Sequence, residues 1–467
     1  MLFSSITFLY YFLPLVVLFY FIVPKKYRNL VLLFSSLIFY GWGEPKYIIW
    51  MVLSIVVHYI LGILIEKYAG TKKAELCLIM SIIFSIGLLG YFKYTDFFIS
   101  NINKVTGLSL PMLSIALPVG ISFYTFQILS YTIDVYRGHT KAQKSFVALA
   151  AYVVLFPQLI AGPIVRYADI ASALEHRTHS FAKWSTGLRR FLFGLGKKVL
   201  IANSLGELSE IFKNTNQNTV LFYWMYAVAF TLQIYFDFSG YSDMAIGLGK
   251  LFGFDFQENF NYPYISHSIT EFWRRWHISL GTWFRDYLYI PLGGNRVKKS
   301  RWLFNILVVW VLTGFWHGAA WNFIIWGMLY ALLLINEKLW LGKALDYLPK
   351  IFSHLYVLLF VVIGFVIFDA ASMGEAIERI ASMFGRGRIK LVDIQSIYYL
   401  RSYGLLFIVA VIGCTPLPKR CLARIRRISH MDHVLAVLEP VFCVIMLLLA
   451  TAYLVDASFN PFLYFRF

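Results

Sequence analysis

The sequence predicts an all-α integral membrane protein with about ten to twelve transmembrane helices, together with helices that lie in the interface or re-enter the membrane. Composition is the first observation: 59% of the 467 residues are hydrophobic and only 14% are charged, which does not fit a soluble protein. The second is that apolar runs recur, many of them near the ~20 residues that cross a hydrocarbon core. The third is that basic residues gather in the short loops beside these runs, as the positive-inside rule expects.

The apolar runs follow one another along most of the chain. They lie near residues 6–23, 29–42, 47–65, 76–92, 113–135, 145–165, 219–236, 303–316, 319–340, 351–368, 400–416 and 434–455. The longer runs are predicted to span the membrane as helices. The shorter ones are equally compatible with re-entrant or buried helices, because irregular backbone at membrane depth must be covered by protein.

The loop charges alternate over the first five runs. No Lys or Arg precedes the first run and no small-residue cleavage site follows it, so we do not expect a cleaved signal. Basic residues follow the first, third and fifth runs: Lys25, Lys26, Arg28, Lys67, Lys72, Lys73, Arg137, Lys141 and Lys144. This alternation predicts a multi-pass protein of the cell membrane with its N-terminus outside.

Two later stretches mix basic and apolar residues, and they are expected to lie in or dip into the cytoplasmic interface. These are residues 166–215 and 254–301. We expect a single membrane domain over 1–467, with N-terminal helices in 1–165, a core that carries the histidine motifs in 166–340, and C-terminal helices in 341–467. The basic tract 419–427 is a further cytoplasmic candidate.

The net charge of +18 does not indicate nucleic-acid binding, because the basic residues lie beside apolar spans, where anionic membrane lipids are the natural partners. The four cysteines form no CxxC pair, so no zinc or redox site is expected. Cys421, in a basic loop, is interpreted as an inert thiol, with palmitoylation as the alternative. Walker A, dinucleotide-binding, GxSxG and HExxH motifs are absent, which disfavours ATP-driven and the commonest hydrolytic chemistries.

His317 is the first candidate catalytic residue. It stands in the apolar, aromatic segment 313–327, where an ionisable side chain is costly and is a functional candidate by default. If this segment is helical throughout, Thr313, Ala320 and Trp321 share its face. Trp316, directly before it, is expected to line a substrate site. A buried, hydrogen-bonded histidine without a catalytic role is the structural alternative.

His277 is the second candidate, in the segment 272–281 with several aromatic residues around it. On a helix it would lie with Trp273, Leu280 and Gly281. Nearby side chains are expected to bind a substrate: Arg274, Arg275, Trp276 and Arg285. Arginine binds phosphate well, so an anionic donor such as coenzyme A or phosphopantetheine fits this cluster. An interfacial helix with an aromatic belt is the alternative.

A third cluster holds two carboxylates beside an apolar run, where they are expensive unless paired or hydrated. Asp237 and Tyr241 are spaced four residues apart, as are Ser239 and Asp243. Asp237, Tyr241 and Asp243 are candidates to orient a histidine or an arginine, or to line a polar tunnel. A purely structural ion pair, for example with Arg166, explains them equally well.

Together these segments resemble the membrane-bound O-acyltransferase superfamily, most closely its bacterial alginate O-acetylation branch. The resemblance spans nearly the whole chain and rests on Ser122–Gln127, Phe156–Pro163, Asp237–Asp243, Asn259–Pro263, Phe272–Leu280, Trp283–Arg296, Gly314–Gly318 and the ending 460–467. The stretch Ile290–Arg296 favours the polysaccharide-acetylating branch over the related D-alanyl transferase of teichoic acid modification.

The resemblance implies a ring of helices around a tunnel, in which His317 matches the near-invariant family histidine. It implies that His277 matches a second position, Asn or His in many members. His317 would be the general base on an acceptor hydroxyl, and His277 would position the thioester or stabilise charge on its carbonyl oxygen. The donor would be acetyl-coenzyme A or an acyl carrier's phosphopantetheine, with no tightly bound cofactor and no metal.

The implied function is transfer of an acetyl group from a cytoplasmic thioester to hydroxyls of an exopolysaccharide such as alginate or cellulose. The acceptor would be reached through an extracytoplasmic acetyltransferase or a polysaccharide-export partner. Two other classes remain: a proton-coupled transporter, for which no internal repeat is visible, and a non-catalytic scaffold of an export complex.

Overall fold

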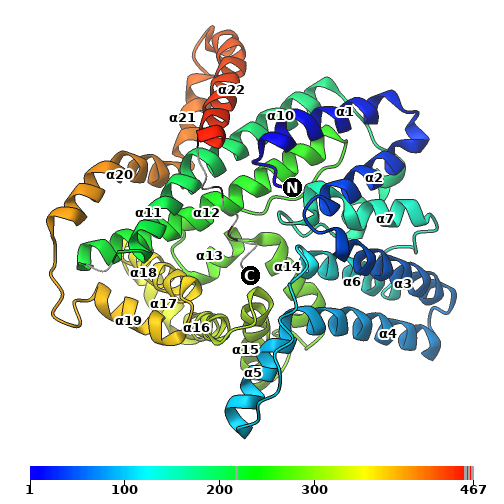
Figure 1. Ribbon diagram of the computed structural model, residues 1–467, viewed down its shortest axis with the longest axis horizontal. Helices are drawn as coiled ribbons and strands as arrows, with labels where there is room; N and C mark the ends of the chain where they lie inside the picture. The colour runs from blue at the N-terminus through cyan, green and yellow to red at the C-terminus, as the bar shows by residue number, and fades with distance from the viewer. Residues whose placement is uncertain (216–218, 457–459, 461–462, 464–467) are drawn as a thin grey trace. The chain divides into compact units, whose positions relative to one another are not determined.

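The computed structural model describes residues 1–215, 219–456, 460 and 463, and over these residues it is helical with no strand (Figure 1). Seven helices in the described chain are long and apolar enough to cross a membrane: Pro45–Lys67, Lys72–Thr106, Val220–Leu251, Trp321–Tyr347, Lys350–Asp369, Ile394–Gly413 and Met431–Asp456. Phe8–Ile22 is a shorter apolar helix. The all-helical, multi-pass class is confirmed, whereas the described residues give seven candidate spans and one shorter apolar helix where ten to twelve spans were predicted.

The chain forms two compact units. The first comprises Met1–Phe191 and Ser242–Gln257, and the second comprises Leu192–Tyr241 and Glu258–Phe467. Helices α10 (Phe181–Gly196) and α12 (Val220–Leu251) contribute residues to both units. All the candidate site residues except Asp243 belong to the second unit.

The first unit is built from apolar helices of very different lengths. Its helices are α1 (Leu13–Ile22), α2 (Arg28–Gly41), α3 (Ile48–Lys67), α4 (Lys72–Leu89), α5 (Thr95–Thr106), α6 (Ile121–Tyr136), α7 (Phe146–Val154), α8 (Phe156–Leu159) and α9 (Tyr167–Glu175). The run near 113–135 is helical only from Ile121, after Gly120 at φ 75°. The run near 145–165 is divided between α7 and α8, because Pro157 is accommodated in the first turn of a new helix but would disrupt the interior of a continuous one.

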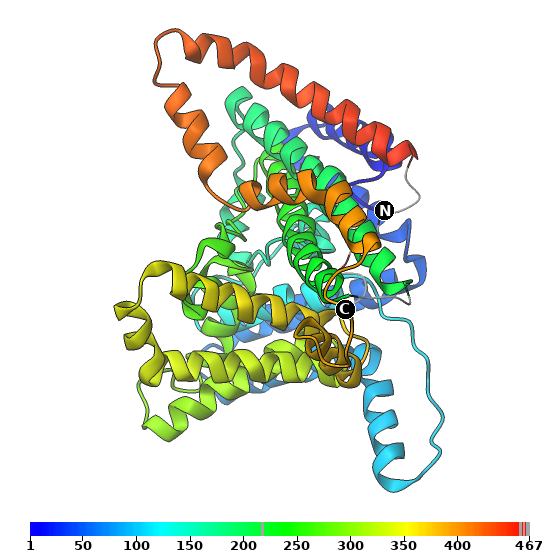
Figure 2. The ribbon, with the colours of Figure 1, turned by 90° about the vertical axis from the view of Figure 1, so that its left-hand side faces the viewer.

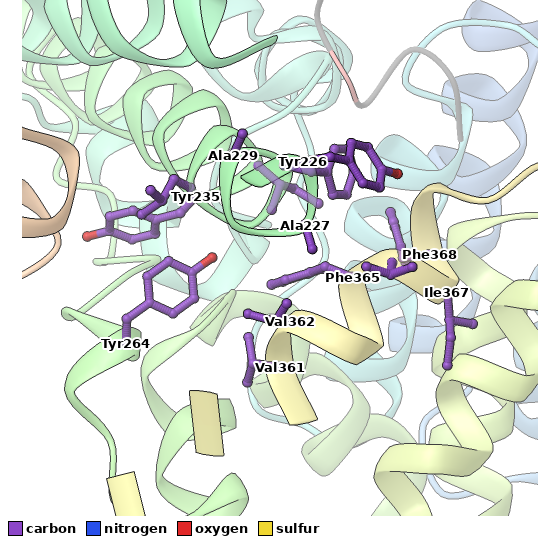
Figure 3. Packing of buried hydrophobic residues seen from close by; sticks show 14 of the residues in the cluster. Tyr226, Ala227, Ala229, Tyr235, Tyr264, Val361, Val362, Phe365, Ile367 and Phe368 are labelled. Carbon is purple, nitrogen blue, oxygen red and sulfur yellow. The ribbon is translucent and has the colours of Figure 1, made fainter. Parts of the chain in front are cut away.

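The second unit holds an aromatic core. Its further helices are α11 (Asn203–Lys213), α13 (Ile269–Arg275), α14 (Ile278–Phe284), α15 (Lys299–His317), α16 (Trp321–Asn336), α17 (Gly342–Tyr347), α18 (Lys350–Asp369), α19 (Met373–Met383), α20 (Ile394–Gly413), α21 (Leu417–Ile425) and α22 (Met431–Asp456). Tyr226 and Tyr235 of α12 pack in one buried cluster with Tyr264 and with Val361 and Phe365 of α18 (Figure 3). Helix α16 packs against both α15 and α18 (Figure 2). This arrangement places the ends of α15 and α18 beside the core.

The last helices of the second unit expose most of their apolar surface. Only 11% of the apolar window of α20, and of α22, is buried within the protein. Such surfaces are stable in lipid, where the exposed side chains are solvated by acyl chains. Between them, α21 carries the basic tract predicted for the cytoplasmic side, and its Cys421 is exposed.

Candidate active site

His317 is the last residue of α15, and the helix does not continue through it as the sequence pattern suggested. Gly318 is extended at φ −162°, and α16 begins only at Trp321. The predicted helical face shared with Ala320 and Trp321 is therefore wrong, while Thr313 does lie one turn before His317 in α15. The helix ends because Gly318 adopts an extended conformation, so the imidazole of His317 lies at the C-terminal end of α15.

The two helices that flank this break approach each other at glycines. A Cβ atom on Gly314 would lie 2.2 Å from the carbonyl oxygen of Phe323, and one on Gly327 would lie 2.2 Å from that of Trp310. Small residues permit such close backbone contact between membrane helices. The contact holds the His317 end of α15 against the first turns of α16.

Aromatic rings enclose the His317 imidazole. Its ring centroid lies 5.0 Å from that of Trp316, 5.3 Å from that of Trp326 and 5.3 Å from that of Phe368. The side chain is buried, with 5% of its surface exposed. These rings restrict the orientation of the imidazole and exclude bulk water from most of its surface.

His277 lies between α13 and α14 rather than on a helix, which corrects the predicted helical grouping with Trp273 and Gly281. Its backbone is left-handed, with φ 44° and ψ 53°. This conformation is uncommon for a residue with a Cβ atom, and it costs free energy that the surrounding structure must supply. His277 is the N-cap residue of α14 and follows Trp276, the C-cap residue of α13.

The tautomer of His277 follows from its hydrogen bond to Asn259. Its Nδ1 lies 3.1 Å from Oδ1 of Asn259, an oxygen that also accepts from the backbone N–H and the hydroxyl of Ser279. Oδ1 can only accept, so Nδ1 of His277 carries the proton. Its Nε2 then presents a lone pair, and this atom is buried with no hydrogen-bond partner in the described part of the chain.

Both histidines line one cavity of about 520 Å³. The cavity also brings together three of the predicted substrate-binding residues, Arg274, Trp276 and Arg285. Burial, with a smaller contribution from nearby His317, holds the pKa of His277 well below its usual value, so His277 is neutral at neutral pH. The cavity can therefore present neutral imidazole to a substrate.

Cationic side chains line the same cavity. They are Arg274, Arg285 and Lys338, and Arg285 pairs with the adjacent Asp286 at 2.6 Å. Arg275, predicted to share this role, does not line the cavity: its guanidinium binds Glu271 at 2.9 Å and the carbonyl of Asn261 at 3.0 Å. The cavity offers these cations to an anionic ligand near the histidines.

Trp276 and Trp316 take different positions. Trp276 lines the cavity and packs against Phe365, with ring centroids 5.1 Å apart. Trp316, predicted to line a substrate site, is not among the residues that line the cavity; its ring packs against both histidines, with its centroid 6.3 Å from that of His277 and 5.0 Å from that of His317. Trp316 thus connects the two candidate catalytic residues by ring packing.

The carboxylates of the third cluster bind cations. Asp237 pairs with Lys198 at 2.5 Å, both side chains being at most 2% exposed, and it accepts the backbone N–H of Leu463 at 3.0 Å. Asp243, in the first unit, pairs with Arg190 at 2.9 Å. Tyr241 is buried and does not line the cavity. From this segment Phe238 is the residue that touches the site, with its ring centroid 4.7 Å from that of His277.

Several site residues are visible only in three dimensions. Asn259 lies in a segment noted for its resemblance, but its contact with His277 depends on two separate loops. Lys338 follows Glu337, whose carboxylate accepts the backbone N–H of Thr270 at 2.9 Å and its hydroxyl at 2.7 Å. A carboxylate at the start of α13 stabilises that helix, and it fixes the segment that leads to Arg274. Sequence spacing carries no signal for either contact.

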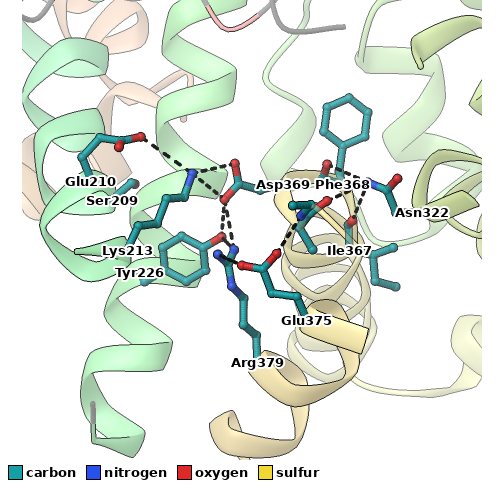
Figure 4. Close-up of polar contacts among 12 residues, drawn as sticks. Ser209, Glu210, Lys213, Tyr226, Asn322, Ile367, Phe368, Asp369, Glu375 and Arg379 are labelled. Atoms are coloured by element: carbon teal, nitrogen blue, oxygen red, sulfur yellow. Dashed lines mark hydrogen bonds and ion pairs between the residues drawn. The ribbon is translucent and has the colours of Figure 1, made fainter. Parts of the chain in front are cut away.

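Figure 4 shows a polar network at the end of α18. Phe368, at this end of the helix, packs against His317 with ring centroids 5.3 Å apart. Asp369 binds Lys213 at 2.9 Å and Arg379 at 3.2 Å, and it accepts a short hydrogen bond from Tyr226. The amide of Asn322 donates to the carbonyl of Ala370 at 2.9 Å. Within the described residues, no group of three or more His, Cys, Asp and Glu side chains is placed to hold a metal ion.

The sequence is similar to a known protein family and to several bacterial proteins. Residues 137–368 match the model of the membrane-bound O-acyltransferase family, MBOAT. The chain is 44% identical to the probable alginate O-acetylase AlgI of Azotobacter vinelandii, over 85% of this chain and 80% of that protein. It is 32% identical to the peptidoglycan O-acetyltransferase of Helicobacter pylori, over 100% of this chain and 98% of that one.

A more remote relative is the teichoic acid D-alanyltransferase of Bacillus subtilis, 30% identical over 54% of this chain and 68% of that protein. The match to AlgI at this identity and coverage shows the family, and the model's matched range includes both histidines of the cavity. The chain therefore belongs to the membrane-bound O-acyltransferase family and is a multi-pass membrane O-acyltransferase.

Proposed function

We propose that this enzyme transfers an acetyl group from a cytoplasmic thioester to hydroxyls of a polysaccharide outside the membrane, with His317 as the general base. The observation that carries the proposal is that His277 and His317 line one cavity together with cationic side chains. A thioester is already activated, so the transfer needs no ATP site. The chemistry needs a base, a positioned donor and exclusion of water, and the aromatic walls of the cavity supply the last.

In this mechanism a ring nitrogen of His317 takes the proton of the acceptor hydroxyl as its oxygen attacks the thioester carbonyl carbon. The tetrahedral intermediate collapses, the carbon–sulfur bond breaks, and the thiolate receives the proton from His317. The products are an acetyl ester and a free thiol. General base catalysis of this kind is worth about 10²–10⁴-fold in rate.

His277 is assigned a positioning role. With its proton held on Nδ1 by Asn259, its Nε2 can accept a hydrogen bond but cannot donate one. Stabilising an oxyanion requires a donor, so of the two roles implied by the family resemblance, positioning fits this tautomer better. Nε2 would accept a hydrogen bond from the acceptor hydroxyl or from an amide N–H of the donor's pantetheine arm.

The cationic wall of the cavity suits the phosphates of the donor. Arg274, Arg285 and Lys338 would bind them, since guanidinium groups match phosphate geometry. Acetyl-coenzyme A and an acyl carrier's phosphopantetheine share this chemistry. The helices would surround the cavity as a ring about a tunnel, with the N-terminus outside and about ten to twelve spans, the shorter apolar helices included.

The relatives suggest the acceptor. The 44% identity to a probable alginate O-acetylase supports an alginate-like exopolysaccharide, reached through an extracytoplasmic acetyltransferase or an export partner. The relative named for peptidoglycan O-acetylation favours a second acceptor, because its alignment covers the whole of this chain. D-alanyl transfer to teichoic acid is less well supported, since that relative aligns with only 54% of the chain.

Chromosomal deletion followed by complementation tests the function and the acceptor together. Ester-linked acetate would be released by mild base from the exopolysaccharide and, separately, from the cell wall. We expect the deletion to abolish acetate in one fraction, wild type to restore it, and His317→Ala expressed at a matched level to fail. Unchanged acetate in both fractions would contradict acetyl transfer, and a proton-coupled flux in proteoliposomes would then favour a transporter.

A further inference from the structure

A second cavity, of about 460 Å³, lies in the first unit and has no part in the acetyl-transfer site. It is bounded by the turn before α2, the end of α9 and the loop that follows, with the lining residues Lys25, Lys26, Arg28, Asn29, Gln143, Ser145, Ala148, Leu174, Glu175, His176, Arg177 and Thr178. Four of these carry a positive charge and Glu175 alone carries a negative one. The cavity is therefore a concave cationic site.

Two of its arginines hold polar atoms that the protein leaves unsatisfied. Nε of Arg28 and one terminal nitrogen of Arg177 are buried without a hydrogen-bond partner among the described residues. Such buried donors are expensive unless a ligand or water accepts from them. Aromatic rings hold both guanidinium groups: Arg28 lies 5.0 Å from the ring centroid of Tyr20, and Arg177 lies 4.7 Å from that of Phe254.

The pKa of His179, in the loop beside the cavity, reflects the same concentration of positive charge. Burial lowers the pKa of His179 to about 4, with additional lowering by Arg28, Arg177, Lys183 and Lys25. His179 is thus neutral at neutral pH and adds no charge of its own. Lys183 is paired with Asp255 at 2.6 Å, but the four cations that line the cavity face Glu175 as the one lining acid, so an anion entering the cavity meets net positive potential.

A smaller cavity, of about 310 Å³ and mainly apolar, is lined by Phe21, His179, Ser180, Phe181, Trp184, Lys250 and Leu251. The loop 176–181 contributes His176, Arg177 and Thr178 to the cationic cavity and its next three residues to the apolar one. The two cavities are therefore neighbours along one stretch of chain, and a ligand that used both would combine a compact anion with a hydrocarbon portion.

The surface around the pair is apolar as well. On α1, Ile22 is 68% exposed, and on α2, Phe34 is 57% exposed, as expected for side chains in contact with lipid. Inorganic phosphate could occupy only the cationic cavity. A phospholipid could occupy both cavities, with its phosphate in the cationic one and part of an acyl chain in the apolar one. Basic pockets between membrane helices are established places for anionic headgroups.

We propose that the cavity formed by Lys25, Arg28 and Arg177 binds the phosphate of an anionic membrane phospholipid, with part of an acyl chain in the apolar cavity beside Trp184. The guanidinium groups of Arg28 and Arg177 donate to the phosphate oxygens, and Lys25 and Lys26 supply further charge at the surface. The site is separate from acetyl transfer and does not depend on the proposed acceptor or donor.

Titration of the purified full-length chain in phosphatidylcholine nanodiscs tests this site. Dioctanoyl-phosphatidylglycerol is the probe, and dioctanoyl-phosphatidylcholine, inorganic phosphate and coenzyme A are run as comparisons; binding is read as Kd and as a rise in the thermal unfolding midpoint. Each charge-assisted hydrogen bond is among the strong ones, so we expect the Arg28→Gln/Arg177→Gln variant to bind phosphatidylglycerol about tenfold or more weakly.

Two further variants keep the test independent of folding. Lys25→Gln/Lys26→Gln changes exposed residues of the same cavity and should also weaken binding. Lys72→Gln/Lys73→Gln removes the same charge from the exposed start of α4 and should leave Kd unchanged. Equal affinity in wild type and both cavity variants would overturn the proposal, as would stabilisation by coenzyme A or inorganic phosphate without stabilisation by phosphatidylglycerol.

Discussion

At the scale of single residues, the site depends on how one hydrogen bond orients His277. Asn259 fixes the Nδ1 proton and also binds Ser279, so one amide oxygen sets both the tautomer and the turn that follows α13. The left-handed backbone of His277 directs the imidazole into the cavity that it shares with His317. Geometry rather than residue type alone makes this histidine available to a substrate.

Replacing Asn259 with alanine should therefore reduce acetyl transfer. The variant loses an orienting hydrogen bond worth about 1 kcal/mol, or roughly fivefold, and more if the wrong tautomer is populated. We expect a loss in kcat/KM in membranes at matched expression. Asn261→Ala is the control, because the contacts of Asn261 to Arg275 are made by its backbone; equal activity in the two variants would argue against the orienting role of Asn259.

At the scale of helices, the site rests on close backbone contact and on one buried ion pair. Helices α15 and α16 touch at Gly314 and Gly327, and this contact places His317 beside Trp326. Lys198, in the π-helical turn Lys197–Ala202, pairs with Asp237 of α12, one residue before the Phe238 ring that packs on His277. The helix contact positions His317, and the ion pair positions the segment of α12 that carries Phe238.

Gly314→Ala should disrupt the pairing of α15 and α16. Its Cβ atom would meet the carbonyl oxygen of Phe323 at 2.2 Å, and overpacking of this kind costs about 1–3 kcal/mol. We expect a lower unfolding midpoint in detergent and reduced acetyl transfer. Gly404→Ala in α20, where no atom lies within 4 Å, is the matched control; a stable, fully active Gly314→Ala protein would contradict the close contact.

The Lys198–Asp237 pair should behave as a buried pair in a double-mutant cycle. Removing one partner leaves the other charge buried and costs about 3–5 kcal/mol, whereas replacing both with apolar residues is close to neutral. Lys198→Met and Asp237→Leu should each destabilise the protein in denaturant unfolding, and the double variant should recover much of the loss. The partly exposed pair Lys183–Asp255 is the comparison, with an expected cost of about 1 kcal/mol or less.

At the scale of the whole molecule, the class of fold could be predicted because few backbone arrangements satisfy all their hydrogen bonds in lipid. The α-helix is the commonest of these, and long apolar runs with few charges are its signature in a sequence. The ends of helices were harder to predict. The breaks at Gly318 and at His277 depend on packing against other segments, and periodicity extended both helices too far. Arg274, Arg285 and the two histidines were identified from residue type, while Asn259 and Lys338 required the fold.

Loop charge also predicts how the chain is inserted. In a variant without its natural cysteines, Lys46→Cys and Lys104→Cys should react with a membrane-impermeant maleimide on intact spheroplasts. Lys72→Cys should react only after the membrane is permeabilised, because the more basic loops face the cytoplasm. These residues flank the candidate spans Pro45–Lys67 and Lys72–Thr106. The opposite labelling pattern would place the N-terminus inside.

The measurement that tests the central claim most directly is transfer of radiolabelled acetyl groups from acetyl-coenzyme A in membranes that contain this chain and its acceptor. Wild type would be compared with His317→Ala and with His433→Ala, which changes an exposed histidine of α22, at matched expression. We predict that His317→Ala lowers the rate by about 10²–10⁴-fold and that His433→Ala does not. Equal labelling by all three proteins would show that His317 is a packing residue and would contradict the account.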